Sequence, residues 1–550
     1  MPPKSQRCPV LRLLLPLIAG YTFAEHAYSA PFWPALLVGL AFTAAAVTLV
    51  YRRPEHNMAW IACLSGGAFC LAAAYYEHRK GYLDAWEKLP PREVELEYHV
   101  ERIFASPFEN RVSGLGRIVR APSHLGELEG RRLHFFFPLD PEEPIPARST
   151  RLRARGVLEA LKTDPSSDGF HDYLLRSGVQ FRFGRGPPPE KSRPARAFFR
   201  FCRERRDTFA KHLRSGSDDN PEAAYVRVHV AMLLGKRQAL EPAQQSAFME
   251  TGTLHLFAIS GLHIGVIAFG LHTVLTILRV RRLPTLIAGL ATLLLYVEVT
   301  GGTPSAVRAF IMVAFLWSSF LFARPANPLA ALGCSALCVL LLFPYQLWNA
   351  GFQLSYTVVA AILMLGMPLA EYWQQTFRPF SGLPRDRLGR IHLMTETGVR
   401  FFLVTLAVSL SATLASSPLS IHYFNVFAPG AVLLNVILVT VASLVISAGM
   451  LALFFGHLGL VPLAVLFNHA AWLVIVFMET AVAAWRHVPA QFWQAEYRAG
   501  FWTGLTVAAL LGSVLLYSER AGRPGWINAV TPFLVFTLLL LAGVRLTFTE

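Results

Sequence analysis

The stretch TLHLFAISGLHIGVIAFGL, residues 253–271, places two histidines and a serine–glycine pair in a segment otherwise apolar enough to cross a bilayer. Polar groups at membrane depth are costly when unpaired, so they usually mark a pathway or a binding site. On an unbroken helix His255 and His263 would lie on one side, roughly 12 Å apart, too far to share a metal ion. We expect Gly261 to break the helix, so that both imidazoles and Ser260 turn toward a cavity. The alternative is that each histidine lies near a membrane interface and bonds a neighbouring carbonyl.

The whole chain has the composition of a polytopic membrane protein. Of its 550 residues 54% are hydrophobic and only 15% are charged, with a mean hydropathy of +0.42. The formal net charge of +15 is large for so apolar a chain, and phospholipid headgroups and nucleic acid are the polyanions such a surface meets. The cysteine and histidine spacings predict no metal site, and the long polar region, which contains only Cys202, cannot form an internal disulfide.

Thirteen hydrophobic spans are expected to form helices that cross or re-enter the membrane. Three of them open the chain, near 10–29, 31–50 and 57–76, and a polar region follows over 77–220. The other ten lie near 252–278, 284–300, 304–322, 328–343, 351–370, 400–419, 430–456, 461–484, 501–517 and 528–546.

The basic loops predict the sidedness of these spans. Lys4 and Arg7 place the N-terminus in the cytoplasm, and residues 52–53 place the second loop there too. The third span then exports the polar region, whose arginines do not oppose this because long domains cross largely regardless of charge. The later basic connections return to the cytoplasmic side; they are 279–282, Arg324, 378–400 and 520–523.

The polar region has the pattern of a small β-barrel followed by a basic helix. Short strands separated by turn-forming residues are expected at 94–104, 114–121, 131–139 and 150–161, which suits an oligonucleotide-binding (OB) barrel or an SH3-like barrel equally well. Between Arg176 and Arg214 twelve Lys and Arg residues then face three acids, with phenylalanines among them. A helix of this kind lies on an anionic membrane surface or guides a phosphate backbone, and the two uses are compatible.

Other polar residues fall inside the apolar spans. Glu298 and Arg308 flank a break formed by Gly301, Gly302 and Pro304, so they are expected either to pair or to line an aqueous cavity. Uncharged hydrogen-bonding side chains also occur in later spans, where they either bond between helices or line a conduit. These are Asn349, Gln353, Ser355 and Asn435.

Signatures of enzymes are scarce. The chain contains neither a Walker A loop nor a GxSxG nucleophile elbow. Ser260 near His263 resembles a serine nucleophile with its base, but no acid lies close in sequence to orient that base. We therefore expect no catalytic activity, no cofactor and no bound metal.

Five stretches carry a resemblance to a known family. They are LLGKRQAL (233–240), HLFAISGLHIG (255–265), TGGTPSAVRAFIM (300–312), NPLAALGCSALCVLLLFPYQLWNAGFQLSY (327–356) and SPLSIHYFNVFAPGAVLLNVI (417–437). In order and spacing they resemble the ComEC-type competence proteins, the inner-membrane DNA channels of natural transformation. The resemblance implies an OB fold for the barrel. Larger members end in a metallo-β-lactamase-like domain with an HxHxDH motif, which this sequence lacks, so the resemblance is to a short form whose second DNA strand is degraded by a separate protein.

The resemblance implies a channel that passes single-stranded DNA across the inner membrane into the cytoplasm. Four parts are expected: transmembrane helices at 1–76, an exported OB-like barrel at 77–190, basic and connecting helices at 191–250, and the channel domain at 251–550. The residues expected to line the channel are His255, Ser260, Gly261, His263, Glu298, Arg308, Asn349, Gln353, Ser355 and Asn435. Those expected to bind DNA are Arg131, Arg132, Arg196, Arg200, Arg203, Arg205, Arg206 and Lys211.

The expected partners are single-stranded DNA, membrane lipid, a periplasmic DNA receptor, and a cytoplasmic ATPase or strand-coating protein that supplies energy. The sequence is also compatible with a homo-oligomer.

Two other functions are alternatives to the channel. A secondary transporter for a small anion or lipid-linked substrate would explain Glu298 and Arg308 but not the basic barrel region, and no inverted repeat supports it. An intramembrane hydrolase would use Ser260 and His263.

Overall fold

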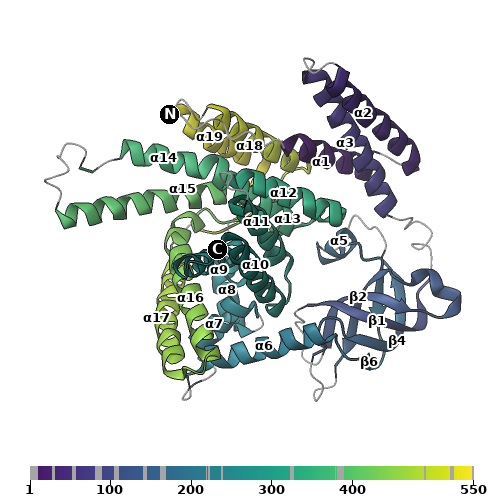
Figure 1. Ribbon diagram of the computed structural model, residues 1–550, viewed down its shortest axis with the longest axis horizontal. Helices are drawn as coiled ribbons and strands as arrows, with labels where there is room; N and C mark the ends of the chain where they lie inside the picture. The colour runs from purple at the N-terminus through teal and green to yellow at the C-terminus, as the bar shows by residue number, and fades with distance from the viewer. Residues whose placement is uncertain are drawn as a thin grey trace. The chain divides into compact units, whose positions relative to one another are not determined.

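The computed structural model describes residues 10–27, 31–52, 57–80, 90–104, 111–139, 145–161, 169–217, 220, 223–236, 239–321, 327–377, 379–380, 389–488, 491–520 and 526–547. They form two compact units (Figure 1). The barrel unit comprises Cys8–Arg205 and Gly333–Asn349, and the helical unit is built mainly from Arg206–Leu332 and Ala350–Glu550. Several charges used to predict the sidedness, among them Lys4, Arg7 and Arg324, lie outside the described residues.

The barrel unit begins with three helices, α1 (Leu11–His26), α2 (Phe32–Arg52) and α3 (Asn57–Lys80). Helix α3 packs against both others, and glycines allow the close approach. A Cβ on Gly20 would lie 2.4 Å from the carbonyl oxygen of Phe69, and one on Gly67 would lie 2.6 Å from the Thr43 hydroxyl. Small residues at helix crossings are the usual device by which membrane helices pack closely.

These helices are tied to a segment far away in the sequence. Helix α12 (Pro328–Leu342) is followed by the 3-10 turn η4 (Pro344–Trp348). The Tyr21 hydroxyl donates to the Leu340 carbonyl at 3.1 Å, and the Trp348 indole donates to the Tyr76 hydroxyl at 3.0 Å. Residues 333–349 therefore pack with the N-terminal helices, although they belong to a sequence stretch that continues into the helical unit.

Five strands close into a barrel in the order β1-β2-β3-β5-β4, and β4 pairs with β1. They are β1 (Arg92–Phe104), β2 (Arg111–Arg120), β3 (Arg132–Pro138), β4 (Arg151–Ala160) and β5 (Phe181–Gly184), with a short β6 (Glu190–Arg193) on the edge of β4. The four predicted strands are confirmed. Strand β3 runs parallel to β5 while the other pairs are antiparallel, which is the OB arrangement and not that of an all-antiparallel SH3-like barrel.

Alternation along the strands builds the barrel core. In β1 the side chains of Val94, Leu96, Tyr98 and Val100 are buried, and the residues between them are more exposed. Two further elements complete the region: η1 (Ser123–Leu128) between β2 and β3, and α5 (Gly169–Arg176) between β4 and β5. The basic helix predicted after the barrel is α6 (Ala197–Arg214).

The helical unit carries the remaining spans. Its helices are α7 (Ala224–Leu234), α8 (Pro242–Glu250), α9 (Gly261–Ile277), α10 (Arg282–Val299), α11 (Pro304–Leu321), α13 (Ala350–Ala361), α14 (Met367–Thr376), α15 (Arg390–Phe424), α16 (Ala431–His457), α17 (Val461–Trp485), α18 (Phe501–Arg520) and α19 (Trp526–Gly543). A 3-10 turn, η3 (Leu254–Phe257), precedes α9, and a π-helical turn, η5 (Ile362–Gly366), joins α13 to α14.

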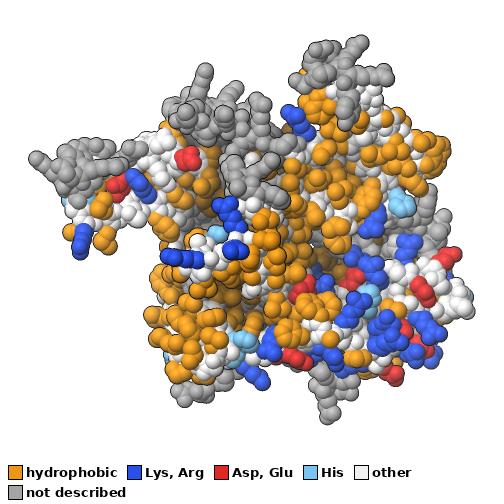
Figure 2. Space-filling model, viewed as in Figure 1, with side chains coloured by type: hydrophobic (Ala, Val, Ile, Leu, Met, Phe, Trp, Pro, Cys, Tyr) orange, Lys and Arg blue, Asp and Glu red, His pale blue; other side chains and the backbone are white. Residues whose placement is uncertain are grey.

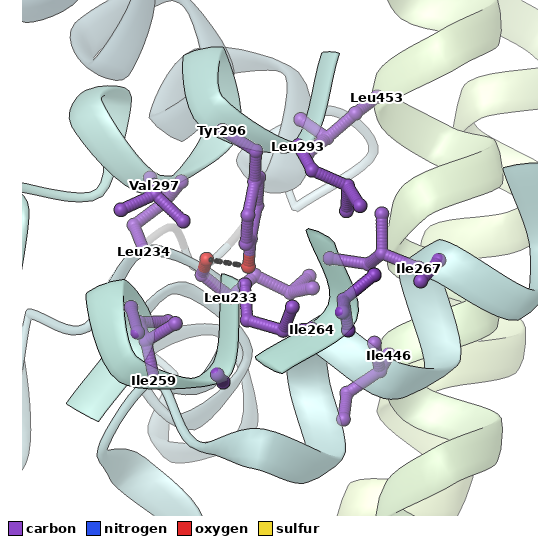
Figure 3. Close-up of a cluster of buried hydrophobic side chains, with 14 of the residues drawn as sticks. Leu233, Leu234, Ile259, Ile264, Ile267, Leu293, Tyr296, Val297, Ile446 and Leu453 are labelled. Carbon is purple, nitrogen blue, oxygen red and sulfur yellow. Dashed lines mark hydrogen bonds between the residues drawn. The ribbon is translucent and has the colours of Figure 1, made fainter. Parts of the chain in front are cut away.

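One buried cluster joins α7, α9, α10 and α16 (Figure 3). The ring of Tyr296 lies among Leu233, Leu293 and Ile264, and its hydroxyl donates to the Leu233 carbonyl at 2.8 Å. This bond satisfies a buried hydroxyl and a carbonyl in the last turn of α7, where the helix itself offers no donor. The cluster therefore fixes α7 against the start of α9.

The chain is a polytopic α-helical membrane protein with an inserted small β-barrel, as the sequence predicts. Eight helices of the described residues are long and apolar enough to span a bilayer, and shorter apolar helices include α9, α12 and part of α19. Figure 2 shows a largely apolar surface over α16 and α17, whereas Lys and Arg side chains gather over the barrel strands.

The structure refines two of the predicted spans. The span expected at 252–278 is broken, as predicted, because η3 and an extended segment precede α9. The span expected at 400–419 lies within the much longer α15, so half of the predicted 378–400 loop is helical. In addition, a small sheet of β7 (Val426–Phe427), β8 (Trp493–Tyr497) and β9 (Val544–Thr547) was not predicted, since strands this short give no clear alternation.

A cluster of three charged residues joins β1, β2 and β3 at a bulge in β1. The register shifts between Val100 and Arg102, which leaves Glu101 as the extra residue, and its carboxylate contacts Arg117 at 2.8 Å and Arg132 at 2.9 Å. The two arginines face each other across β2 and β3. Burial alone would raise the pKa of Glu101, but Arg132 and Arg117 outweigh it and hold the pKa below its ordinary value.

Replacing Glu101 with Gln should destabilise the barrel by roughly 1–3 kcal/mol at pH 7, because two half-buried guanidinium groups lose their counter-charge. Hydrogen exchange of β1 and β2 peptides in the full-length protein measures this loss. Since the folded-state pKa is lowered, the difference from the parent should be full above the ordinary pKa of 4.5 and shrink as the pH falls through the lowered value.

The matched control is Glu95→Gln. Glu95 contacts Arg153 at 3.5 Å with both side chains more than half exposed, so its loss should change exchange little. Equal effects of the two substitutions would contradict the structural role of Glu101.

Candidate functional site

The break before α9 is built around Ser260. This residue is the N-cap of α9, in an extended conformation with φ −113° and ψ 177°. Its hydroxyl accepts a hydrogen bond from the backbone N–H of His263, and its own N–H donates to the His263 Nδ1 atom at 3.3 Å. The pair thus forms a capping box, with a histidine where Glu or Gln is usual. The helix break that the sequence predicts is present, and Ser260 marks it, while Gly261 is the first helical residue.

His263 is fully buried. Its Nδ1 atom accepts from the Ser260 N–H, and its Nε2 atom is buried without a hydrogen-bond partner among the described residues. The Ser260 hydroxyl also lies 3.1 Å from Nδ1. The arrangement can hold a helix start in place without a charge, and among the described residues it includes no carboxylate that would orient a catalytic base.

His255 and Gly261 turn to the outside, away from His263. The His255 ring is exposed, with Nδ1 3.1 Å from the Gly252 carbonyl oxygen. A Cβ added to Gly261 would meet nothing within 4 Å, and the same holds for Gly265, one turn further along α9. The motif therefore has an inner side, where His263 caps the helix, and an open side that presents His255 and two glycines.

The segment between η3 and α9 is also held from α11. Ser305 donates from its hydroxyl to the Ile259 carbonyl at 2.7 Å, which satisfies a backbone group that no helix bonds. Ser305 is not among the residues predicted from the sequence. Its position in the TGGTPSAVRAFIM stretch, three residues before Arg308, could have indicated it.

Arg308 joins α11 to α13. Its side chain is buried, with 6% exposed, and its Nη2 atom donates to the Gly351 carbonyl and to the Ser355 hydroxyl, each at 2.9 Å. The structure thus brings together two predicted residues, Arg308 and Ser355. Glu298 is half-buried at the end of α10.

The other predicted polar residues have separate environments. Gln353 accepts from the Tyr423 hydroxyl at 3.1 Å, which links α13 to α15. Asn435 lies in α16, and its Oδ1 atom is buried without a hydrogen-bond partner among the described residues. Asn349 ends η4 and belongs to the barrel unit. Whether any of the three lies at membrane depth and lines a passage stays a prediction.

The basic helix α6 has two kinds of cationic residue. Arg196, just before it, and Arg200, Arg203 and Lys211 within it are exposed. Arg205 instead lies over the Phe201 ring, 5.0 Å from its centroid, and Arg206 donates to the Leu234 carbonyl at 3.1 Å. The first group is available to a polyanion, whereas Arg206 caps the end of α7.

The two arginines predicted to bind DNA from the barrel also differ. Arg132 forms the ion pair with Glu101 and donates to the Ser177 carbonyl at 3.1 Å. Arg131 precedes β3, and its backbone N–H donates to the Leu128 carbonyl at 3.0 Å. The contacts of Arg132 are structural, so its guanidinium is less available to a phosphate than those of the exposed α6 arginines.

Arg308 and Ser355 should be energetically coupled. Ser355→Ala removes a hydrogen bond to a charged group, which should lower the stability by roughly 1–3 kcal/mol, and Arg308→Met should cost more because it also frees the Gly351 carbonyl. In a double-mutant cycle measured by thermal unfolding in detergent, the double variant should be less destabilised than the sum of the two. Strict additivity would show that the contact contributes nothing.

Comparison with known proteins relates the chain to a protein family. The sequence profile described as "Competence protein" matches residues 232–521, more than half of the chain. ComE operon protein 3 of Bacillus subtilis (strain 168) is 27% identical over 290 residues, which cover 53% of this chain and 33% of that protein. Competence protein ComA of Neisseria gonorrhoeae is 29% identical over 168 residues, 29% of this chain and 24% of that protein.

An uncharacterized protein of Aquifex aeolicus (strain VF5) is 30% identical over 141 residues, 25% of this chain and 33% of that protein. The matches thus span about a third or less of the length of these relatives. No solved structure matches the chain. The profile match contains the capped break before α9, the Arg308 contacts, and all ten residues expected to line a channel. The chain belongs to the competence protein family.

Proposed function

We propose that this protein is a channel of the bacterial inner membrane that passes single-stranded DNA into the cytoplasm during natural transformation. The observation that carries the proposal is the family match over 232–521, because it coincides with the part of the chain that holds the helix break and the buried arginine. One relative, from Neisseria gonorrhoeae, is named as a competence protein. The polytopic helical fold and the OB-type barrel are both compatible with moving a nucleic acid across a membrane.

In this proposal the barrel and α6 lie on the outer side of the membrane and receive the strand. The basic loops support that orientation, with the N-terminus in the cytoplasm. Exposed Arg196, Arg200 and Arg203, together with the exposed rings of Phe198 and Phe201, give α6 both charge and stacking surface. OB barrels bind oligonucleotides on the strand β2–β3 face, which fits the same role.

The passage itself would run through the helical unit. A polyanion crossing a low-dielectric slab needs groups that replace water and counter-ions along its path. The open side of the α9 motif, with His255, Gly261 and Gly265, supplies space and polarity, and Arg308 supplies a fixed positive charge. The remaining predicted lining residues, among them Glu298 and Asn435, are proposed to extend this path.

The wider machinery follows from the same chemistry. The expected partners are single-stranded DNA, membrane lipid and a periplasmic receptor that delivers the strand. Energy would come from a cytoplasmic ATPase or from proteins that coat the arriving strand, since the sequence contains no Walker A loop. The proposed division into 1–76, 77–190, 191–250 and 251–550 assigns reception to the second and third parts and passage to the fourth.

Gly261→Leu should abolish DNA entry into the cytoplasm while DNA uptake into the periplasm continues. A side chain fits at this position without displacing neighbours, so the variant should fold and project into the open side. Ser260→Ala should retain most activity, because loss of the N-cap costs about 1 kcal/mol and leaves the passage open. A transformation assay that scores periplasmic and cytoplasmic DNA separately measures both.

The matched control is Gly270→Leu on the same helix. Gly270 also has open space around it, and nine residues at 3.6 per turn place it about 180° from Gly261. Because Gly261 and Gly265 are also spaced as a helix-pairing motif, the oligomeric state of each variant is measured in parallel. If Ser260→Ala is inactive while Gly261→Leu is active, the conduit is wrong and a serine hydrolase is favoured.

The exposed arginines of α6 should bind DNA through its phosphates. Changing Arg196, Arg200 and Arg203 to Gln should weaken binding of a single-stranded oligonucleotide and reduce the salt slope by about 2, since each phosphate contact on a single strand contributes about 0.7. Arg153→Gln with Arg155→Gln is the control, because these arginines already pair with Glu95 and Glu93. Unchanged affinity in the α6 variant would leave α6 a membrane anchor only.

A further inference from the structure

A hollow of about 530 Å³ lies between α9, α10 and α11 in the helical unit. It is lined by His272 and Thr276 of α9, by Arg279 and Arg282 around the turn, and by Trp317 and Phe320 of α11. This volume is within the range of small-molecule sites, about 300–1,000 Å³. None of these residues was used in the channel proposal.

Aromatic rings form one wall of the hollow. The His272 ring stacks on Phe320 at 5.7 Å with an 18° interplanar angle, and its centroid lies 5.7 Å from that of Trp317. Trp317 is fixed by Gly289, where a Cβ would come within 2.2 Å of the indole ring. The wall is therefore rigid, and it exists because α10 has no side chain at this position.

The rim of the hollow is cationic. Arg279 and Arg282 line it, with Arg281 between them, and within the described residues none of the three forms an ion pair. The helix dipole of α9 favours a cation at its C-terminal end, which accounts for Arg279. It does not explain Arg281 and Arg282, which stand at the positive N-terminal end of α10, whose first turn contains no acidic residue. The local field at the rim is thus strongly positive.

Arg279 also adopts a backbone conformation that favours glycine. Its φ is 54°, it follows the end of α9, and its N–H bonds to the Thr276 carbonyl at 3.0 Å. Glycine is the usual residue at such a helix end because a Cβ is disfavoured there. An arginine in this place accepts backbone strain and puts a guanidinium at the mouth of the hollow.

The surface next to the hollow is apolar and exposed. Ile277, Leu278, Leu283 and Ile287 are each more than half exposed, as is Phe269 on α9. In a membrane protein such side chains contact the acyl chains of lipid. A ligand that satisfies both parts needs an anionic head for the rim and hydrocarbon for the neighbouring helix surface, which a nucleic acid lacks.

We propose that this hollow binds the headgroup of an anionic phospholipid, with its acyl chains along α9 and α10. The phosphate contacts Arg279 and Arg282, and the glycerol region packs on His272 and Trp317. Basic hollows between membrane helices on the cytoplasmic side are suited to such headgroups, and the basic turn at 279–282 is predicted to face the cytoplasm. None of its lining residues is among those proposed to line the DNA passage, so the proposal does not depend on whether the protein conducts DNA.

Native mass spectrometry of the full-length protein in detergent tests the proposal with phosphatidylglycerol, phosphatidylcholine and glycerol 3-phosphate as probes. The parent should bind phosphatidylglycerol more tightly than phosphatidylcholine. Arg279→Gly should weaken that binding about fivefold, and Arg279→Gly with Arg282→Gln about 25-fold, from the usual contribution of one cation near an anionic lipid. Because glycine relieves the strain at position 279, the single variant should unfold at the same temperature or higher.

The control is Arg390→Gln, an exposed arginine at the start of α15 and remote in sequence from the hollow. Its affinity for phosphatidylglycerol should equal that of the parent. Equal affinity of the parent and the double variant, or no preference of the parent for phosphatidylglycerol, would overturn the proposal. Glycerol 3-phosphate that competes as well as the lipid would also overturn it, because the site would then take a free phosphate.

Discussion

Backbone and side-chain polar groups at membrane depth must find partners inside the protein, and the helical unit is organised by how it meets this requirement. The helical ladder is interrupted just before α9. There, Ser260 and His263 satisfy each other's donors and acceptors, and Ser305 of α11 bonds the Ile259 carbonyl. These bonds allow a short non-helical segment to exist beside apolar helices. The same segment exposes His255 and the Gly261 face, so the break and the proposed passage have one physical origin.

Arg308 follows the same rule with a full charge. Its guanidinium is held by the Gly351 carbonyl and the Ser355 hydroxyl, both on α13. The carbonyl lies in the first turn of α13, where carbonyl oxygens already accept from the helix ladder, so Arg308 acts as a second donor to a backbone oxygen. This contact couples α11 to α13. It places a permanent positive charge near the N-terminal ends of both helices.

The β-barrel itself meets a different requirement, because charged side chains lie on its exposed surface. Glu101 forms ion pairs with Arg117 and Arg132 at the bulge of β1, while Arg200 and Arg203 are exposed on α6. Positive charge is therefore divided by function: some arginines hold the barrel together, and others are left available to a polyanion. The basic rim at Arg279 and Arg282 in the helical unit is a third group, directed toward lipid in our proposal.

Sequence alone determined the membrane-protein class, the helices and the small barrel, because apolar length and period-two alternation are local properties. It also located the break near Gly261 and the importance of Arg308. Tertiary structure decided which partner each polar group takes: His263 turns inward to cap a helix, whereas Arg206 and Arg132 are used in structural contacts. The strand order that distinguishes the OB barrel could be learned only from the tertiary structure. The same is true of the grouping of residues 333–349 with the N-terminal helices. The physical reason is that hydrogen bonds and ion pairs form between residues up to hundreds of positions apart, and local patterns carry no information about such distances.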